Sequence, residues 1–269
     1  MVLNKLISKI PDLPLYLEAI IVILCSITAT FIGLILGGIA LPLLQVIAIV
    51  PFFLKNVWNW RLWRASGLVL LWSLVLTISV AAASYGIGCS IDHVSRVIKG
   101  QSYLSEMIHW IETGEGPEGD PSLFIMPKII EISLFSIITF LTVGIGGLFM
   151  GAILLNYMNL YYGTVIYMAN GDLNAILFGW PIYAIIRVIG YVFLGTYLSR
   201  LAMNIVEKKP LNQLFTGTAR KLLITALILI ILDFILKATI ANTLYQPLLN
   251  SIIDQEKLII CKQIIKGIT

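Results

Sequence analysis

The sequence predicts an all-α polytopic membrane helix bundle with about seven transmembrane helices, six to seven in all, and an external amphipathic helix. Apolar residues make up 59% of the 269 residues and charged residues only 12%, whereas soluble domains are about one quarter charged. Several apolar runs reach the roughly 20 residues that a membrane-spanning helix needs. We therefore expect a single transmembrane domain with N-terminal helices at 15–88, an external helix and loop at 89–127, a helical core at 128–246 and an amphipathic tail at 247–269.

The first two predicted spans form a hairpin. An apolar run covers 15–36, and two glycines separate it from a second run at 39–54. The second run is short and contains Pro42 and Pro51, so it either spans the membrane or forms a re-entrant piece. The remaining runs predict spans at 65–85, at 129–154, in a short segment that continues towards residue 168, at 173–199 and at 222–244.

The charges between the spans predict the orientation in the membrane. The segments 54–66 and 199–221 carry an excess of Lys and Arg, whereas 89–127 carries six acidic and two basic residues. Because cytoplasmic loops are enriched in Lys and Arg, we expect a cytoplasmic N-terminus, in agreement with Lys5 and Lys9, and an external C-terminus. The expected location is the cytoplasmic membrane of a bacterial or archaeal cell. The lipid bilayer is the expected partner, and the lack of a Lys/Arg tract argues against nucleic acid.

Two segments have the periodicity of amphipathic rather than spanning helices. In 90–112, apolar residues from Ile91 to Ile111 share one face, and a Gly- and Pro-rich loop follows at 114–121. The C-terminal tail repeats the pattern with Leu249, Ile253, Ile260 and Ile264. We expect the first segment to lie on the outer membrane surface. Both should pack against the rim of the bundle, and the alternative is a docking surface for a partner or for lipid.

Two triplets of small or amide residues share the spacing i, i+3, i+7, which places each triplet on one helix face. They are Gly144, Gly147 and Gly151, followed by Asn156, Asn159 and Gly163. Helices in lipid associate by close backbone approach, so small residues mark contact faces. We expect bulky substitutions at Gly147 or Gly151 to disrupt packing. The asparagine amides are expected to bond across helices or to cap a break between the fourth and fifth spans.

Ionisable residues inside predicted spans are costly and therefore informative. They are Glu18, Arg187, Asp233 and Lys237. Asp233 and Lys237 are four residues apart and are expected to neutralise each other. Arg187 needs an anionic partner, which Asp233 or Glu18 would supply. We expect a structural ion pair, with a proton or anion path as the alternative. A further pair, Lys128 and Glu131, is expected to snorkel to the membrane interface.

The sequence predicts no enzyme, no catalytic residue, no metal site and no cofactor. It lacks the HExxH, Walker and GxSxG motifs. The only histidines, His93 and His109, lie in a polar segment and are expected to be solvated. None of Cys25, Cys89 and Cys261 has metal-ligand spacing. The topology places Cys89 and Cys261 outside, where they either pair in a disulfide or remain free thiols.

Residues 140–246 resemble the stage II sporulation protein M family in three stretches: FLTVGIGGLFMGAILLNYMNLYYG, FGWPIYAIIRVIGYVFLGTYLS and the basic GTARK. That family has a Gly-rich span, an Asn followed by Gly, a Pro-led span, a basic loop and a final helix. Its members often carry a glutamate in the Pro-led span, about where Ile186 and Arg187 stand here. The resemblance implies a helper within a membrane assembly rather than a fixed reaction.

These observations predict a non-catalytic subunit or accessory factor of a membrane protein assembly. Its partners would be other membrane protein subunits or a second copy of itself. The alternative is a transporter or permease-type subunit that moves a small solute, peptide or ion, and this alternative requires ionisable residues that water reaches.

Overall fold

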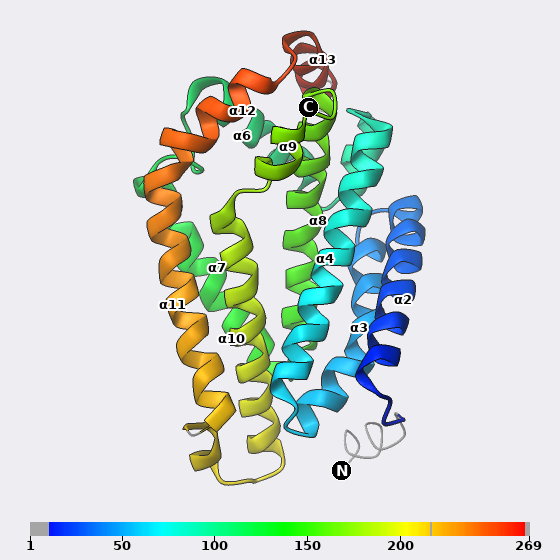
Figure 1. The fold of residues 1–269 in the computed structure, drawn as a ribbon, viewed down its shortest axis with the longest axis vertical. Coiled ribbons are helices and arrows are strands. Elements are labelled where there is room, and N and C mark those ends of the chain that lie inside the picture. The colour runs from blue at the N-terminus through cyan, green and yellow to red at the C-terminus, as the bar shows by residue number, and fades with distance from the viewer. Residues whose placement is uncertain (1–10, 216, 267–269) are drawn as a thin grey trace.

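A bundle of long helices forms the body of the protein, which confirms the predicted all-α membrane architecture (Figure 1). The computed structural model describes residues 11–215 and 217–266. In this part, six helical segments have the length and apolar composition of membrane spans, and α8 is a further long helix that runs among them. The long helices are α2 (Leu15–Leu36), α3 (Ala40–Trp58), α4 (Leu62–Ile87), α7 (Pro121–Leu141), α8 (Ile145–Met168), α10 (Ile182–Val206) and α11 (Gly217–Ile240).

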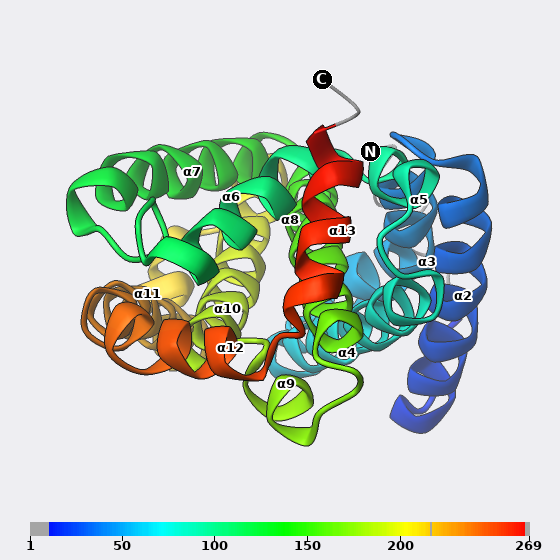
Figure 2. The same ribbon diagram turned by 90° about the horizontal axis from the view of Figure 1, so that it is seen from above.

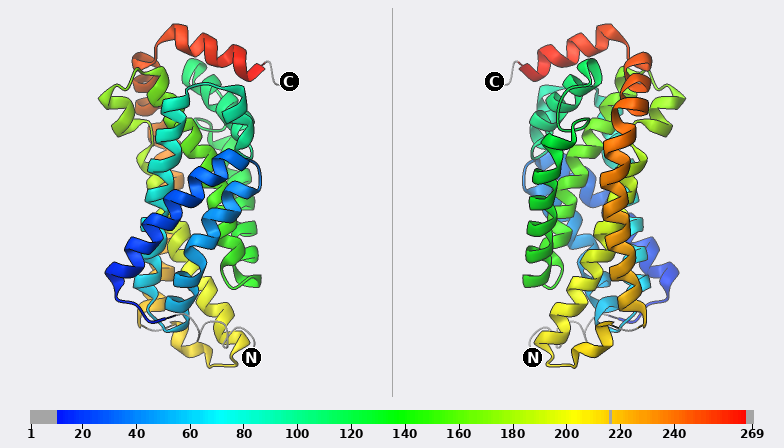
Figure 3. Two further views of the ribbon diagram at one scale, coloured as in Figure 1. Left: turned by 90° about the vertical axis from the view of Figure 1, so that its right-hand side faces the viewer. Right: turned by 90° about the vertical axis from the view of Figure 1, so that its left-hand side faces the viewer.

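Short helices cover one end of this bundle, as Figure 2 shows from above. We call them the cap: α5 (Ile91–Arg96), α6 (Gly100–Thr113), α9 (Leu173–Phe178), α12 (Gln246–Ile252) and α13 (Gln255–Lys266). A π-helical turn at Ala241–Tyr245 joins α11 to α12. In the side views of Figure 3, α13 lies across the ends of the long helices rather than along them.

The segment 39–54 belongs to a helix long and apolar enough to span, so the hairpin alternative holds over the re-entrant one. Gly37 and Gly38 make the turn with positive φ angles of 73° and 55°, a region that glycine enters without steric cost. Gly33 lets α2 and α3 approach closely, because a Cβ there would lie 2.7 Å from Cα of Leu41.

The predicted boundary between the fourth and fifth spans is wrong. Helix α7 starts at Pro121 rather than near 129, because Asp120 caps it by accepting a hydrogen bond from the Ser122 amide at 2.8 Å and proline suits the first helical position. The break then falls at 142–144, where Val143 and Gly144 have φ angles of 55° and 96°. The asparagines of 156–159 therefore lie inside α8 and cap no break.

The two amphipathic segments pack on the rim of the bundle, as expected, but their helices differ from the prediction. The first is broken into α5 and α6, since Lys99 has a φ of 60°. Its apolar face turns inward and not to the membrane surface, with Leu104 and Ile111 fully buried. In the tail, an extended Ile253 interrupts the helix. This shifts the helical register, so Leu258, Cys261 and Ile265 are buried whereas Ile260 is 50% exposed.

The charged connections segregate to opposite ends of the bundle. The α3–α4 and α10–α11 connections share the end away from the cap in Figure 1. Arg200 donates to the carbonyl oxygens of Val57 and Trp58 there, and Lys209 lies over the Trp58 ring. The positive-inside rule predicts that this end is cytoplasmic. Lys5 and Lys9, which support the same orientation, lie outside the described residues.

Candidate functional site

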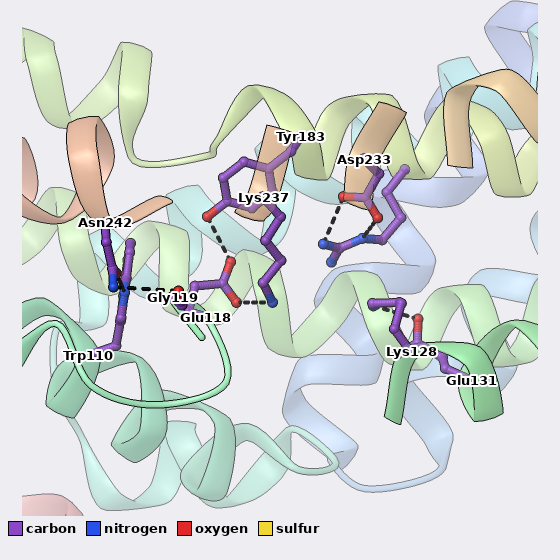
Figure 4. Close-up of polar contacts among 10 residues, drawn as sticks. Trp110, Glu118, Gly119, Lys128, Glu131, Tyr183, Asp233, Lys237 and Asn242 are labelled. Atoms are coloured by element: carbon purple, nitrogen blue, oxygen red, sulfur yellow. Dashed lines mark hydrogen bonds and ion pairs between the residues drawn. The ribbon is translucent and has the colours of Figure 1, made fainter. Parts of the chain in front are cut away.

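Three residues on one face of α10 each meet a carboxylate from another element. Tyr183, Arg187 and Tyr191 are four residues apart, which is the spacing of one helical face. The Tyr183 hydroxyl donates to Glu118 at 2.7 Å, and the Tyr191 hydroxyl donates to Glu131 at 2.7 Å. We call the complete set the polar ladder: Glu118, Lys128, Glu131, Tyr183, Arg187, Tyr191, Asp233 and Lys237. Figure 4 shows this set except for Tyr191.

The charges of the polar ladder cancel in pairs. Arg187 binds Asp233 through two parallel hydrogen bonds, Nε to Oδ2 at 2.8 Å and Nη2 to Oδ1 at 3.0 Å. The other two pairs, Lys237–Glu118 and Lys128–Glu131, each close at 2.8 Å. Bidentate and charge-assisted bonds of this kind are the strong ones in proteins. The ladder therefore contains three acids, three bases and no formal net charge.

The ion pairs of the predicted intramembrane charges agree only in part with the sequence analysis. Asp233 is the partner of Arg187, as expected. The predicted neutralisation of Asp233 by Lys237 is wrong, because Arg187 occupies both carboxylate oxygens and Lys237 turns to Glu118. Glu18 lies at the opposite end of the bundle and pairs with Arg64 at 2.8 Å.

Lys128 and Glu131 also lie differently from the prediction. They face the inside of the bundle rather than snorkelling to an interface, because Tyr191 of α10 donates to Glu131 and so holds the α7 side chains inward. Figure 4 shows both pointing into the space between the helices.

Glu118 reaches the ladder from the loop between α6 and α7, and the loop is anchored by side-chain bonds. Trp110 donates its indole N–H to Asn242 at 2.7 Å, and Asn242 donates to the carbonyl oxygen of Gly114 at 3.0 Å. Burial favours the neutral form of Glu118, but the positive charges of Lys237 and Arg187 and the hydrogen bonds from Lys237 and Tyr183 outweigh it. They hold the pKa of this carboxyl below its usual value. Glu118 is therefore an ionised member of the site that sequence analysis placed only in an external loop.

A cavity opens next to the polar ladder, between α7 on one side and α3 and α4 on the other, with α8 and α10 behind. Its volume is about 70 Å³. One end is lined by Lys128, Glu131 and Arg187, together with Tyr157 of α8 and Tyr191 of α10. Apolar side chains line the remainder, among them Phe53, Trp72, Phe135, Leu154 and Val192.

The predicted glycine face divides into packing and non-packing positions. A Cβ on Gly147 would collide with the side chain of Thr139 on α7, and a Cβ on Gly163 would collide with Ala81 of α4. These two glycines therefore pack helices, as predicted. Gly144 belongs to the turn before α8. The packing prediction is wrong for Gly151, where a Cβ would meet nothing within 4 Å because the position borders the cavity.

The two asparagines of α8 also have different roles. Asn156 exchanges two hydrogen bonds with Gln45 of α3, at 3.0 and 2.7 Å, and so bonds across helices as expected. Asn159 is fully buried, and neither amide atom has a hydrogen bond among the described residues.

The cap contains two features that the sequence left open or misplaced. Cys89 and Cys261 form a disulfide with Cα atoms 5.3 Å apart, which ties α13 to the end of α4, and Cys25 is a free, exposed thiol. His93 is buried rather than solvated and shares a 2.9 Å hydrogen bond with Ser84. Burial lowers its pKa. His109 is exposed, as expected.

Comparison with known protein families, with curated proteins and with solved structures finds no match to this chain. The resemblance of residues 140–246 to the stage II sporulation protein M family therefore stays a prediction.

Proposed function

We propose that this polytopic membrane protein is a permease-type protein that binds its cargo inside the helix bundle. One observation carries the proposal: charged side chains of two ion pairs, Arg187–Asp233 and Lys128–Glu131, border a cavity between spanning helices. Ionisable residues at membrane depth are costly, and they mark substrate and ion pathways. A mainly apolar pocket with a few convergent polar groups is also the usual form of a small-molecule site.

The two ion pairs at the cavity lie on three different helices. Arg187 lies on α10, its partner Asp233 on α11, and the pair Lys128–Glu131 on α7. A cargo that accepts hydrogen bonds from the free N–H groups of Arg187 and Lys128 would change the contacts between these helices. Such differential contacts are what a ligand needs in order to shift a conformational equilibrium.

Thiol labelling tests whether water reaches this cavity. We would place cysteine at Val188, which lines the cavity beside Arg187, and at Ala226, which is fully buried against α10 and outside the cavity. The background is Cys25→Ser, which removes the free thiol and keeps the disulfide. A small charged methanethiosulfonate should modify Val188→Cys at least about tenfold faster than Ala226→Cys. Equal protection of both, with Ser102→Cys on the cap reacting as an exposed control, would refute the proposal.

The complete pairing of the charges favours a second candidate, the non-catalytic accessory subunit. Buried ion pairs without net charge are compatible with a fixed structural network, and the resemblance to the sporulation protein family points to a helper role. Native mass spectrometry after gentle extraction distinguishes the two candidates. Stoichiometric foreign subunits would support the accessory role, whereas a chain that retains a small molecule and no partner would support the permease.

A further inference from the structure

We propose that the cavity binds a neutral single-chain amphiphile, with an uncharged, oxygen-rich head at the polar ladder and one hydrocarbon chain in the apolar slot. The inference deepens the proposed function, because it names the chemical class of the cargo at the same site. It depends on three properties of the cavity: its unequal ends, its length and the charge balance at its head.

The head end offers hydrogen-bond donors that the protein does not use. Within the described residues, Arg187 donates hydrogen bonds from Nε and Nη2, so its Nη1 hydrogens remain free. Lys128 uses one of three N–H groups for Glu131. Tyr157 also lines the cavity, and its hydroxyl has no hydrogen bond among the described residues. Three side chains that line this end of the cavity therefore keep hydrogen-bond donors that acceptor oxygens of a ligand could use.

The rest of the cavity offers hydrocarbon contact only. The hydroxyl groups along it are already bonded within their own helices: Ser73 donates to Leu70, Thr139 to Phe135, Thr196 to Val192 and Ser199 to Gly195. The remaining wall consists of aromatic and aliphatic side chains and glycines. A ligand portion in this region gains from burying apolar surface and has no polar partner to meet.

The length of the slot matches one acyl chain. On α10 the lining residues extend from Arg187 at the head end to Ser199, which is about 18 Å of helix and of the order of the length of one extended fatty acyl chain. The slot separates α7 from α3 and α4, whereas α7 packs against α8 and α10. Gly151 and Gly195 both border the slot, and the missing side chain at Gly151 leaves open space. The glycine-rich sequence of α8 therefore makes room for a ligand as well as for a neighbouring helix.

The charge balance selects a neutral head over an anionic one. The acids and bases of the polar ladder already cancel. A carboxylate or phosphate added there would be an uncompensated charge at membrane depth, which is costly. Hydroxyl and ester oxygens accept hydrogen bonds from Arg, Lys and Tyr without adding charge. A monoacylglycerol meets these requirements, and a fatty acid anion does not.

Photolabelling of the full chain in nanodiscs tests the proposal. The probe is a glycerol monoester of a fourteen-carbon acid with a diazirine in the chain, and the labelled peptides are located by mass spectrometry. We expect labelling on α7, α8 and α10 at slot residues. Excess unlabelled monomyristin should reduce it at least tenfold, and myristate at the same concentration should not. Tyr157→Phe should weaken competition about threefold to tenfold, the value of one hydrogen bond.

Two glycine variants supply a matched pair. Gly151→Leu fills the slot, whereas Gly67→Leu makes the same change on exposed α4 surface, and a Cβ meets nothing within 4 Å at either position. Slot labelling should fall about tenfold or more in Gly151→Leu and stay unchanged in Gly67→Leu. Equal labelling in both variants, or equal competition by monomyristin and myristate in the wild-type chain, would overturn the inference. The competition arm needs no variant, so it holds even if Gly151→Leu fails to fold.

The failures of the two proposals are distinguishable. If Val188→Cys reacts with the thiol reagent but the photoprobe labels no slot residue, the permease proposal stands and the inference of an amphiphile as cargo is wrong. If the photoprobe labels the slot and Val188→Cys is protected, the amphiphile is a bound lipid, and the permease proposal is wrong.

Discussion

Gly147 and Gly151 form one GxxxG pair on α8, yet the structure predicts opposite effects for the same substitution at each. Alanine gains about 0.5–1 kcal/mol over glycine inside a helix at either position. At Gly151 nothing offsets this gain, since a Cβ there meets nothing within 4 Å. We therefore expect Gly151→Ala to be stabilising by that amount.

At Gly147 the new methyl group would press on Thr139. It would lie 3.0 Å from Cβ and 3.1 Å from Cγ2 of that threonine. Thr139 is buried and donates to the Phe135 carbonyl at 2.5 Å, so it cannot turn away without losing that bond. Overpacking of this kind costs about 1–3 kcal/mol, which exceeds the helix gain over most of that range. The two alanine variants should therefore differ by about 1–3 kcal/mol.

Unfolding of the purified protein in mixed micelles, titrated with SDS, measures this difference directly. The expected order of midpoints is Gly151→Ala above wild type and Gly147→Ala below it. A shift of the same sign and size in both variants would show that the contact with Thr139 does not limit the approach of α7 and α8, and the packing argument would fail.

Three further changes test the polar ladder, the buried histidine and the disulfide. Glu118→Gln should lower the free energy of unfolding by about 3–5 kcal/mol, because Lys237 is left buried without its counter-charge. The pKa of Glu118 is held below its ordinary 4.5, so its contribution to the free energy of unfolding is complete above about pH 4.5. This contribution is lost as pH falls through the lowered pKa. Glu118→Gln should lack this acid-dependent loss in the same assay. Burial lowers the pKa of His93 from 6.5, so the unfolded form binds a proton more readily than the folded form. Amide exchange in α5, corrected for intrinsic rates, should therefore speed up as pH falls below about 6.5. His93→Gln should remove that dependence. Cys261→Ser should increase amide exchange across α13, which loses its covalent tie to α4, whereas Cys25→Ser should leave it unchanged.

The spans could be predicted from sequence because the bilayer imposes their length and composition. Their ends were harder. The start of α7 carried a readable signal, Asp120 as the cap and Pro121 in the first turn. The break at 142–144 carried little, since its residues are Thr, Val and Gly in an apolar run and the turn depends on positive φ at two of them. No pattern of hydrophobicity marks such a turn.

The polar ladder was half visible in the sequence. Tyr183, Arg187 and Tyr191 repeat every four residues, a periodicity that would have marked α10 as the element that gathers the site. Glu118 could not be found this way, because it lies in a loop 119 residues away from Lys237 in the chain. The split of the glycine face was also hidden, since spacing gives a common face but not the neighbour that each glycine meets.

Charge accounting explains why the loop before α7 must enter the bundle. Arg187 takes both oxygens of Asp233 and Lys128 binds Glu131. Among the described residues, Lys237, one turn along α11, therefore takes its counter-charge from Glu118 in the loop. A buried ammonium without a partner would deprotonate or pull its helix towards water. Glu118 removes that cost, and Trp110 and Asn242 hold its loop in place. The cap is therefore part of the electrostatic structure of the bundle, and a movement of the α6–α7 loop would change the charge of the ladder that borders the cavity.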